Sequence, residues 1–518
     1  GSLREATGYT NAYTFRNTLQ YTGEYAGKHY ISLFAGQEIQ ERTAYNSFNY
    51  SPVFDEEHRI VGFPEMDGID GSEINYNALG GTGKSVSKMS SFFANASYSY
   101  LDKYILTGAL RYDGSDIIGN DNQFTPLWNV GLRLNLHREE FMKRWMWVDQ
   151  FAVRGGFGYT GSIDKNALPF VVMTLGQSVV YDGQTVPTSF SYPNPNVKWQ
   201  TKQDMNVGLD LSLFDYRLEL GVNYYHNITR DVLDRKALPY SSGRSEVTEN
   251  VADIYNSGWE IDLGVTLLKN KSFQWYAKAN IAINDNKVKN TYYKDTEDLP
   301  RATLSNAHQF VENQPVNGWY GYKFAGINPI NGAVMTYTGN GEATLDMSVS
   351  GATWPTPSVF YLGNLTPPVV GGFSTSANWK QLIFSANFEF KTGHKIKSFN
   401  TFRSLDARNR HTSEANRWRE PGDITNVPAM SEAFTTYSSY MYDILLEKGN
   451  YLRCSYMTLG YNLKPEWLHK IGFSTARLSF TAKNLFTISS YSGIDPALMG
   501  SFGYPNSRKY TITLNVGF

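Results

Sequence analysis

The chain has 518 residues, enough for several soluble domains or for one large β-barrel. Its 47 Lys and Arg residues balance 48 Asp and Glu residues, so the net charge of −1 argues against a nucleic-acid-binding protein, which needs a basic face. The mean hydropathy is −0.40 and no apolar run reaches about 18 residues, which excludes a transmembrane helix. A transmembrane barrel is not excluded, because alternating strands average out in a hydropathy window.

Alternation of apolar and polar residues is the dominant pattern along the chain. Between residues 259 and 265, for example, Trp259, Ile261 and Leu263 fall on one face of a strand, and Glu260 and Asp262 fall on the other. The same pattern predicts about 15 strands in all. They are expected near residues 12–24, 28–42, 88–101, 103–112, 126–136, 149–160, 199–213, 217–227, 256–268, 273–285, 368–379, 381–393, 450–463, 474–487 and 508–518.

The length of these strands favours a membrane barrel over a soluble sandwich. About nine to eleven tilted residues cross a bilayer, whereas sandwich strands typically have about five or six. One face of nearly every strand carries Glu, Asp, Lys, Asn or Gly, as expected for a polar lumen. The aromatic content of 15 %, led by 36 Tyr and 30 Phe, suits the aromatic girdles of such barrels.

Short and long connections alternate between the predicted strands. The short ones are Glu24–Lys28, Leu101–Lys103, His137–Asp149 with a small amphipathic turn, Phe214–Arg217, Leu268–Ser272, Trp379–Gln381 and Leu463–Thr475. The long ones run over 44–86, 113–125, 163–197, 228–255, 285–366, 394–449 and 488–507. Outer-membrane barrels have short periplasmic turns and long extracellular loops. We therefore expect an antiparallel barrel whose C-terminus lies in the periplasm.

The C-terminal strand alternates up to an aromatic last residue. Leu514, Val516 and Phe518 share one face, as in the terminal strand that the barrel-assembly machinery of the outer membrane recognises; an ordinary edge strand of a soluble protein is the alternative. Bacterial barrels close with an even number of strands. A count of 15, together with the absence of a signal peptide, predicts that N-terminal strands are missing from this chain.

No catalytic or cofactor-binding motif is present, so we expect neither an enzyme nor a cofactor. Cys454 is predicted to be a packed or lipid-facing residue, and His394 and His411 lack metal-ligand spacing. The acidic stretches Asp67–Glu73 and Asp113–Asp121 have oxygen ligands for Ca²⁺ but lack the pattern of a calcium loop, so solvated loops are the simpler interpretation.

Aromatic residues cluster at Trp319, Tyr320, Tyr322 and Phe324 within the longest predicted loop. They are candidates for stacking on a sugar ring or on a peptide. Packing within the loop, or against a partner protein, is the alternative that we favour.

Several segments resemble SusC/RagA-type TonB-dependent transporters of Bacteroidota. The closing hairpin is similar at Lys483–Phe486, Gly493–Pro496, Gly503–Pro505 and Arg508. Further similar segments are Lys103–Asp116, Asn194–Leu233, Asn256–Val265, Gly318–Ile327, Gly363–Phe373 and Tyr451–Leu463. The resemblance covers nearly the whole chain, in order, so residues 1–518 are expected to be the C-terminal part of such a barrel.

The resemblance implies a 22-stranded barrel in the outer membrane, with an N-terminal plug domain and first strands that this chain lacks. It implies active import of oligosaccharides or oligopeptides, driven by TonB–ExbB–ExbD acting through the missing N-terminal part. The expected partners are a SusD-like surface lipoprotein, a glycan or peptide substrate and membrane lipid or lipopolysaccharide; a dimer of such transporter–lipoprotein pairs is one assembly it allows. A passive porin-like channel and an extracellular β-rich adhesin or carbohydrate-binding protein are the alternatives.

Overall fold

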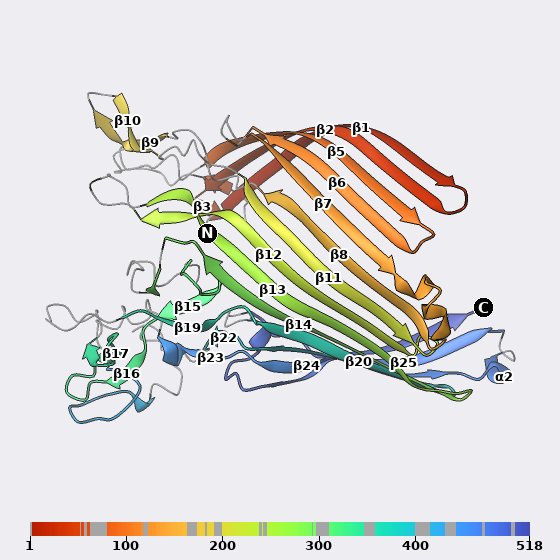
Figure 1. Ribbon diagram of the computed structural model, residues 1–518. Helices are drawn as coiled ribbons and strands as arrows, with labels where there is room; N and C mark the ends of the chain where they lie inside the picture. The colour runs from red at the N-terminus through yellow and green to blue at the C-terminus, as the bar shows by residue number, and fades with distance from the viewer. Residues whose placement is uncertain are drawn as a thin grey trace. The chain divides into compact units, whose positions relative to one another are not determined.

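A computed structural model shows a nearly all-β chain (Figure 1). It describes residues 3–51, 53–55, 60–62, 80–116, 118, 123–162, 173–181, 184–190, 199–237, 241, 246–292, 294–296, 310–345, 358–398, 415–429, 442–468, 472–498 and 503–518. Within these ranges, no helix has both the length and the apolar character needed to cross a bilayer.

Fifteen long strands form one antiparallel sheet in which each strand is hydrogen-bonded to its neighbours in chain order. They are β1 (Leu3–Tyr25), β2 (His29–Ser51), β5 (Gly80–Tyr100), β6 (Tyr104–Ser115), β7 (Phe124–Asn135), β8 (Val148–Ser162), β11 (Gln200–Leu213), β12 (Leu218–Ala237), β13 (Glu246–Lys269), β14 (Phe273–Lys289), β20 (Val369–Trp379), β21 (Leu382–Thr392), β24 (Tyr451–Asn462), β25 (Thr475–Ser489) and β26 (Lys509–Gly517). All fifteen predicted strands are confirmed, with β1 and β26 at the two ends of the order.

The chain divides into two compact units. Unit 1 comprises Gly1–Leu101, Ile105–Val130 and Gly158–Thr201 and contains β1, β2 and β5. Unit 2 comprises Asp102–Tyr104, Gly131–Phe157 and Lys202–Phe518 and contains the strands from β12 onward.

Several strands extend into segments that we predicted to be loops. In unit 2, β12 and β13 stay paired from Leu218 and Val265 to Ala237 and Glu246, so most of the predicted loop 228–255 is strand. In unit 1, β2 and β5 likewise shorten the predicted loop 44–86 from both sides. These extensions carry polar residues on both faces, and a pair of strands with water on both sides needs no apolar alternation.

Eleven short strands lie in the remaining connections of the described residues. They are β3 (Val53–Asp55), β4 (Ile60–Gly62), β9 (Met173–Tyr181), β10 (Gln184–Phe190), β15 (Gly318–Gly321), β16 (Phe324–Ile327), β17 (Val334–Tyr337), β18 (Ala343–Leu345), β19 (Phe360–Asn364), β22 (Lys395–Lys397) and β23 (Leu446–Lys448). In unit 2 the small strands from β15 to β19 gather at one end of the long strands, and α2 (Pro465–Leu468) lies at the other (Figure 1).

Hydrogen bonds between neighbouring turns hold the short turns of unit 2. In the turn after β11, residues Phe214, Asp215 and Tyr216 all have positive φ, between 57° and 61°. The Phe214 amide donates to the Trp147 carbonyl over 2.9 Å, and the Tyr216 amide donates to an Asp149 carboxylate oxygen over 2.9 Å. The predicted amphipathic turn before β8 forms two 3-10 helices, η3 (Leu136–Arg138) and η4 (Met142–Arg144). These contacts keep the turns compact despite their strained backbone.

Candidate functional site

One face of unit 1 carries a network of charged side chains. Arg16 and Glu38 lie directly opposite one another on β1 and β2 and form an ion pair. Arg111 on β6 reaches Glu38 over 3.9 Å, binds Asp113 over 2.6 Å and donates to the Ser91 hydroxyl over 3.0 Å. This network gives one face of unit 1 a row of hydrogen-bond donors and acceptors, which we call the polar wall.

Unit 2 has a similar network of charged side chains, formed by different residues. Arg133 on β7 donates to Asp210 on β11 over 3.0 Å, and Arg154 on β8 approaches the other oxygen of Asp210 over 3.4 Å. Arg154 also donates to the Asn223 side chain on β12 over 2.5 Å. Charged hydrogen bonds, which are stronger than neutral ones, thus link the polar faces of β7, β8, β11 and β12.

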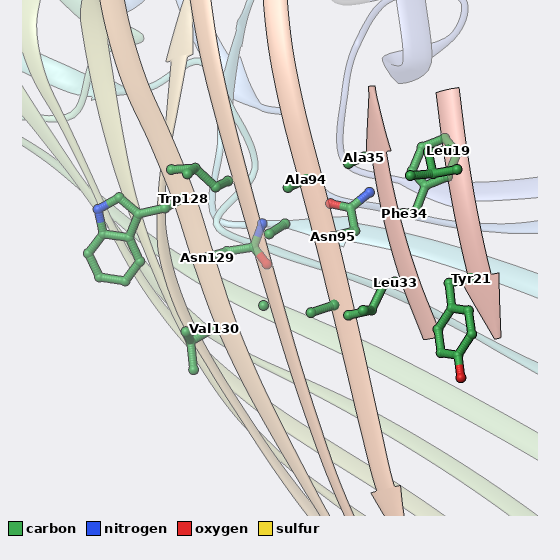
Figure 2. A pocket seen from close by; sticks show the side chains of 14 residues that line it. Leu19, Tyr21, Leu33, Phe34, Ala35, Ala94, Asn95, Trp128, Asn129 and Val130 are labelled. Atoms are coloured by element: carbon green, nitrogen blue, oxygen red, sulfur yellow. The ribbon is translucent and has the colours of Figure 1, made fainter. Parts of the chain in front are cut away.

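The opposite face is apolar and exposed. In unit 1 a groove with a volume of about 560 Å³ crosses this face, and none of the residues that line it is charged. Figure 2 shows Leu19 and Tyr21 on one side of this groove and Trp128 and Val130 on the other. The small side chain of Ala35 lies between Leu19 and Ala94 in the strand register, which explains the depression. Its lining is mostly apolar, with Asn95 and Asn129 as its amide side chains, so the groove is a surface feature of the apolar face.

The aromatic cluster of the longest loop forms a small core of its own. Tyr320 and Tyr322 are 2 % and 1 % exposed and pack with Tyr442, which lies 120 positions beyond Tyr322 in the chain. Burial raises the pKa of Tyr320 far above its usual value. Trp319 is half-buried against Leu362 and donates from its indole nitrogen to the Lys395 carbonyl over 2.8 Å. The aromatic side chains therefore pack within the loop, as the alternative favoured from the sequence had it. Contact of these residues with a ligand or partner stays a prediction.

The C-terminal strand β26 exposes its apolar face. Leu514 is 62 % exposed and Phe518 is 94 % exposed, and Val516 lies between them on the same face. The Phe518 ring lies 5.2 Å from the Phe473 ring. Recognition of these residues by assembly machinery stays a prediction.

A polar pocket lies where β13 and β14 of unit 2 meet the connection to β15 and the end of β19. Its volume is about 570 Å³. Six asparagines contribute to its lining, namely Asn256, Asn284, Asn286, Asn313, Asn317 and Asn364, and we call it the carboxamide pocket. Sequence analysis missed this site, because its asparagines are spread over more than a hundred positions.

A buried ion pair was also missed. Arg453 on β24 and Asp495 are 4 % and 7 % exposed and form a hydrogen-bonded ion pair. The Arg453 Nε donates to the Thr487 hydroxyl over 3.1 Å, and Asp495 accepts from the Ala497 amide over 2.9 Å. The pair fixes the connection between β25 and β26 to the polar side of β24.

A second set of polar contacts holds β23 to the connection between β25 and β26. Glu447 accepts hydrogen bonds from the hydroxyls of Ser398 and Ser492 and, over 2.8 Å, from the Ser492 amide. Burial alone would raise the pKa of Glu447, but these hydrogen bonds outweigh it and hold the pKa below its ordinary value. The carboxylate therefore stays ionised at neutral pH.

The residues considered for metal binding do not converge where the structure describes them. Within those ranges, no group of three or more His, Cys, Asp or Glu side chains is arranged to hold an ion. His394 is buried, and burial lowers its pKa; Asp113 is paired with Arg111. Cys454 is fully buried. His411 and Asp67–Glu73 lie outside the described residues.

Comparison with protein families shows to which family this sheet, polar on one face and apolar on the other, belongs. Residues 1–391 match the family described as TonB dependent receptor-like, beta-barrel. The chain belongs to this family. TonB-dependent receptor barrels are proteins of the outer membrane, so the apolar face of the sheet, with its groove, is the face that meets lipid.

Curated relatives support the same assignment. The chain is 28 % identical to TonB-dependent receptor P3 of Formosa agariphila, over 97 % of the chain and 52 % of that protein. It is 23 % identical to TonB-dependent receptor SusC of Bacteroides thetaiotaomicron, over 83 % of the chain and 43 % of that protein. The chain therefore spans about half the length of the curated relatives that it matches.

Among solved structures, the fold is similar to that of a RagAB peptide importer in an 'open-open' state. The TM-score is 0.80 at 24 % identity, and the match covers 100 % of this chain and 56 % of the other. The RagAB peptide transporter matches with a TM-score of 0.79 at 23 % identity, over the same shares of the two chains. These similarities show the fold of a SusC/RagA-type barrel.

Proposed function

We propose that the chain forms the C-terminal part of the barrel of an active importer, which carries oligosaccharides or oligopeptides across the outer membrane with energy delivered through TonB. The plug, the first strands of a 22-stranded barrel and the site of contact with TonB–ExbB–ExbD belong to a further part of the native protein. A SusD-type lipoprotein captures the substrate at the cell surface and delivers it to the barrel.

Family membership over residues 1–391 is the observation that carries this proposal. The charged network from Arg16 to Asp113 and its counterpart around Asp210 support it, because a polar wall offers successive hydrogen bonds to a polar oligomer. The solved structure with a similar fold is described as a peptide importer, which supports oligomers as cargo. No catalytic step is part of the proposal.

Removal of TonB tests the energy source. Uptake of fluorescent short oligosaccharides and of a labelled casein digest is measured in the native bacterium and in a strain that lacks this protein; the difference is the uptake that the protein supports. We expect that difference to vanish when TonB is deleted. If it persists, active import is wrong and the passive porin-like channel takes its place.

The adhesin alternative conflicts with the family assignment and with the exposed apolar face. Leu514 at 62 % exposure would be costly in water as part of a continuous apolar face. The protein should therefore require detergent to stay monodisperse. A soluble, monodisperse preparation without detergent would restore the adhesin alternative.

A further inference from the structure

The carboxamide pocket has an unusual balance of hydrogen-bond donors and acceptors. An asparagine side chain offers one acceptor oxygen and two N–H donors. In this pocket most of the carboxamide oxygens already accept a hydrogen bond from the protein: Tyr225 donates to Asn284 over 2.8 Å, Val316 to Asn286 over 2.7 Å, and Asn286 to Asn256 over 3.2 Å.

Carboxamide oxygens at the rim of the pocket also accept hydrogen bonds from the protein. Lys289 donates to the oxygen of Asn313, and the Tyr361 hydroxyl donates to that of Asn364 over 2.5 Å. Burial raises the pKa of Tyr361 to about 12, so this hydroxyl stays protonated and keeps the Asn364 oxygen occupied at physiological pH. Five of the six carboxamide oxygens therefore already accept one hydrogen bond from the protein, which leaves each of them a single further lone pair.

The amide nitrogens of four of the six asparagines are available. Within the part of the chain that the structure describes, no protein atom accepts a hydrogen bond from the side-chain nitrogens of Asn256, Asn284, Asn313 and Asn364. Asn256, Asn284 and Asn364 are half-buried and Asn313 is exposed, so solvent or a ligand can reach them. The wall of the pocket is thus rich in donors.

The pocket carries no uncompensated charge. Asp285 and Lys287 are the charged residues of its lining, and they pair over 2.8 Å. Apolar surface comes from the rings of Pro315, Pro367 and Pro368. Its volume of about 570 Å³ falls within the range of ligand sites, about 300–1,000 Å³. A neutral ligand with many acceptor oxygens fits this combination.

Resting on the proposed import function, we propose that the carboxamide pocket is a binding subsite for a neutral oligosaccharide. Hydroxyl and ring oxygens of the sugar accept hydrogen bonds from the four free amide groups, and sugar C–H faces lie on the proline rings. A sugar hydroxyl can turn its own hydrogen toward water or a neighbouring hydroxyl. A peptide main chain brings one N–H per residue that needs an acceptor, and five of the six carboxamide oxygens here have only one lone pair left to offer.

Substitution of asparagine by aspartate tests the subsite with little change in shape. Asn284→Asp and Asn364→Asp keep the oxygen that accepts from the neighbouring tyrosine and replace the free N–H donors by a second oxygen. Asn331→Asp is the matched control, because its oxygen accepts from the Ala333 amide over 3.1 Å and it lies outside the pocket. Calorimetry on the purified native protein in detergent uses malto-, xylo-, manno- and galacto-oligosaccharides, with a casein digest as the peptide probe.

We expect at least one neutral oligosaccharide to bind, and each pocket variant to weaken that binding about tenfold while the control does not. Heat-modifiable mobility on gels verifies that the variants are folded. Unchanged affinity in both pocket variants, or binding of the casein digest alone, overturns the subsite. Because calorimetry needs no TonB, a failure of the subsite and a failure of TonB-driven import are distinguishable.

Discussion

At the scale of single residues, function depends on groups whose partners lie far away in the chain. Arg453 and Asp495 are separated by 42 positions, and neither belongs to a recognisable motif. Period-two patterning places Arg453 on the polar face of its strand, but it says nothing about which carboxylate will reach it. The asparagines of the carboxamide pocket were missed for the same reason.

Loss of Asp495 should release the connection between β25 and β26. Asp495→Ala leaves the Arg453 charge buried, with Glu389 at 3.8 Å as a weaker partner, and removing one member of a buried pair costs about 3–5 kcal/mol. We expect amide exchange over residues 491–498 to accelerate on the order of a hundredfold, measured by mass spectrometry in detergent.

The double variant Arg453→Met with Asp495→Leu provides the control for that experiment. Replacing both members by apolar residues leaves no buried charge, so exchange over the same residues should be slower than in Asp495→Ala. Exchange at the rate of the parent protein in Asp495→Ala would show that the ion pair does not hold the connection.

At the scale of elements, strands that border lipid were predictable and strands that border water on both sides were not. The part of β13 from Trp259 to Val265 alternates strictly, and its prediction is confirmed. The paired ends of β12 and β13 near Ala237 and Glu246 do not alternate, and a bulge with Asp231 at a φ of 58° interrupts them. The short strands β15 to β19 depend on the buried tyrosines of the loop core, a contact that no local pattern reveals.

The segregation of short turns from long loops leads to a prediction about sidedness. We propose that the short turns and the C-terminus lie in the periplasm and the long connections outside. Cysteine is introduced at Lys271, in a short turn, or at Asn331, in a long connection; the native Cys454 is fully buried and should stay unlabelled. A membrane-impermeant maleimide on intact cells should label Asn331→Cys and not Lys271→Cys. The reverse pattern would invert the proposed orientation.

At the scale of the whole molecule, the fifteen hydrogen-bonded strands form a sheet with one polar face and one apolar face. Charged pairs such as Arg133 and Asp210 lie on the polar face, and exposed apolar residues such as Leu263 and Leu514 lie on the other. Burial in lipid removes the apolar face from contact with water. This burial is the main contribution to the stability of a sheet of this kind. The central claim is therefore that these two faces meet water and lipid, respectively, in the native membrane.

Electron paramagnetic resonance along β13 tests that claim most directly. Spin labels are placed one at a time at Trp259, Glu260, Ile261, Asp262 and Leu263 in the native protein, in outer-membrane vesicles. We predict strict alternation: labels at the three apolar positions collide mainly with oxygen, which dissolves in lipid, and labels at the two acidic positions collide mainly with a water-soluble nickel complex. Equal access of the nickel complex to all five positions would contradict the account.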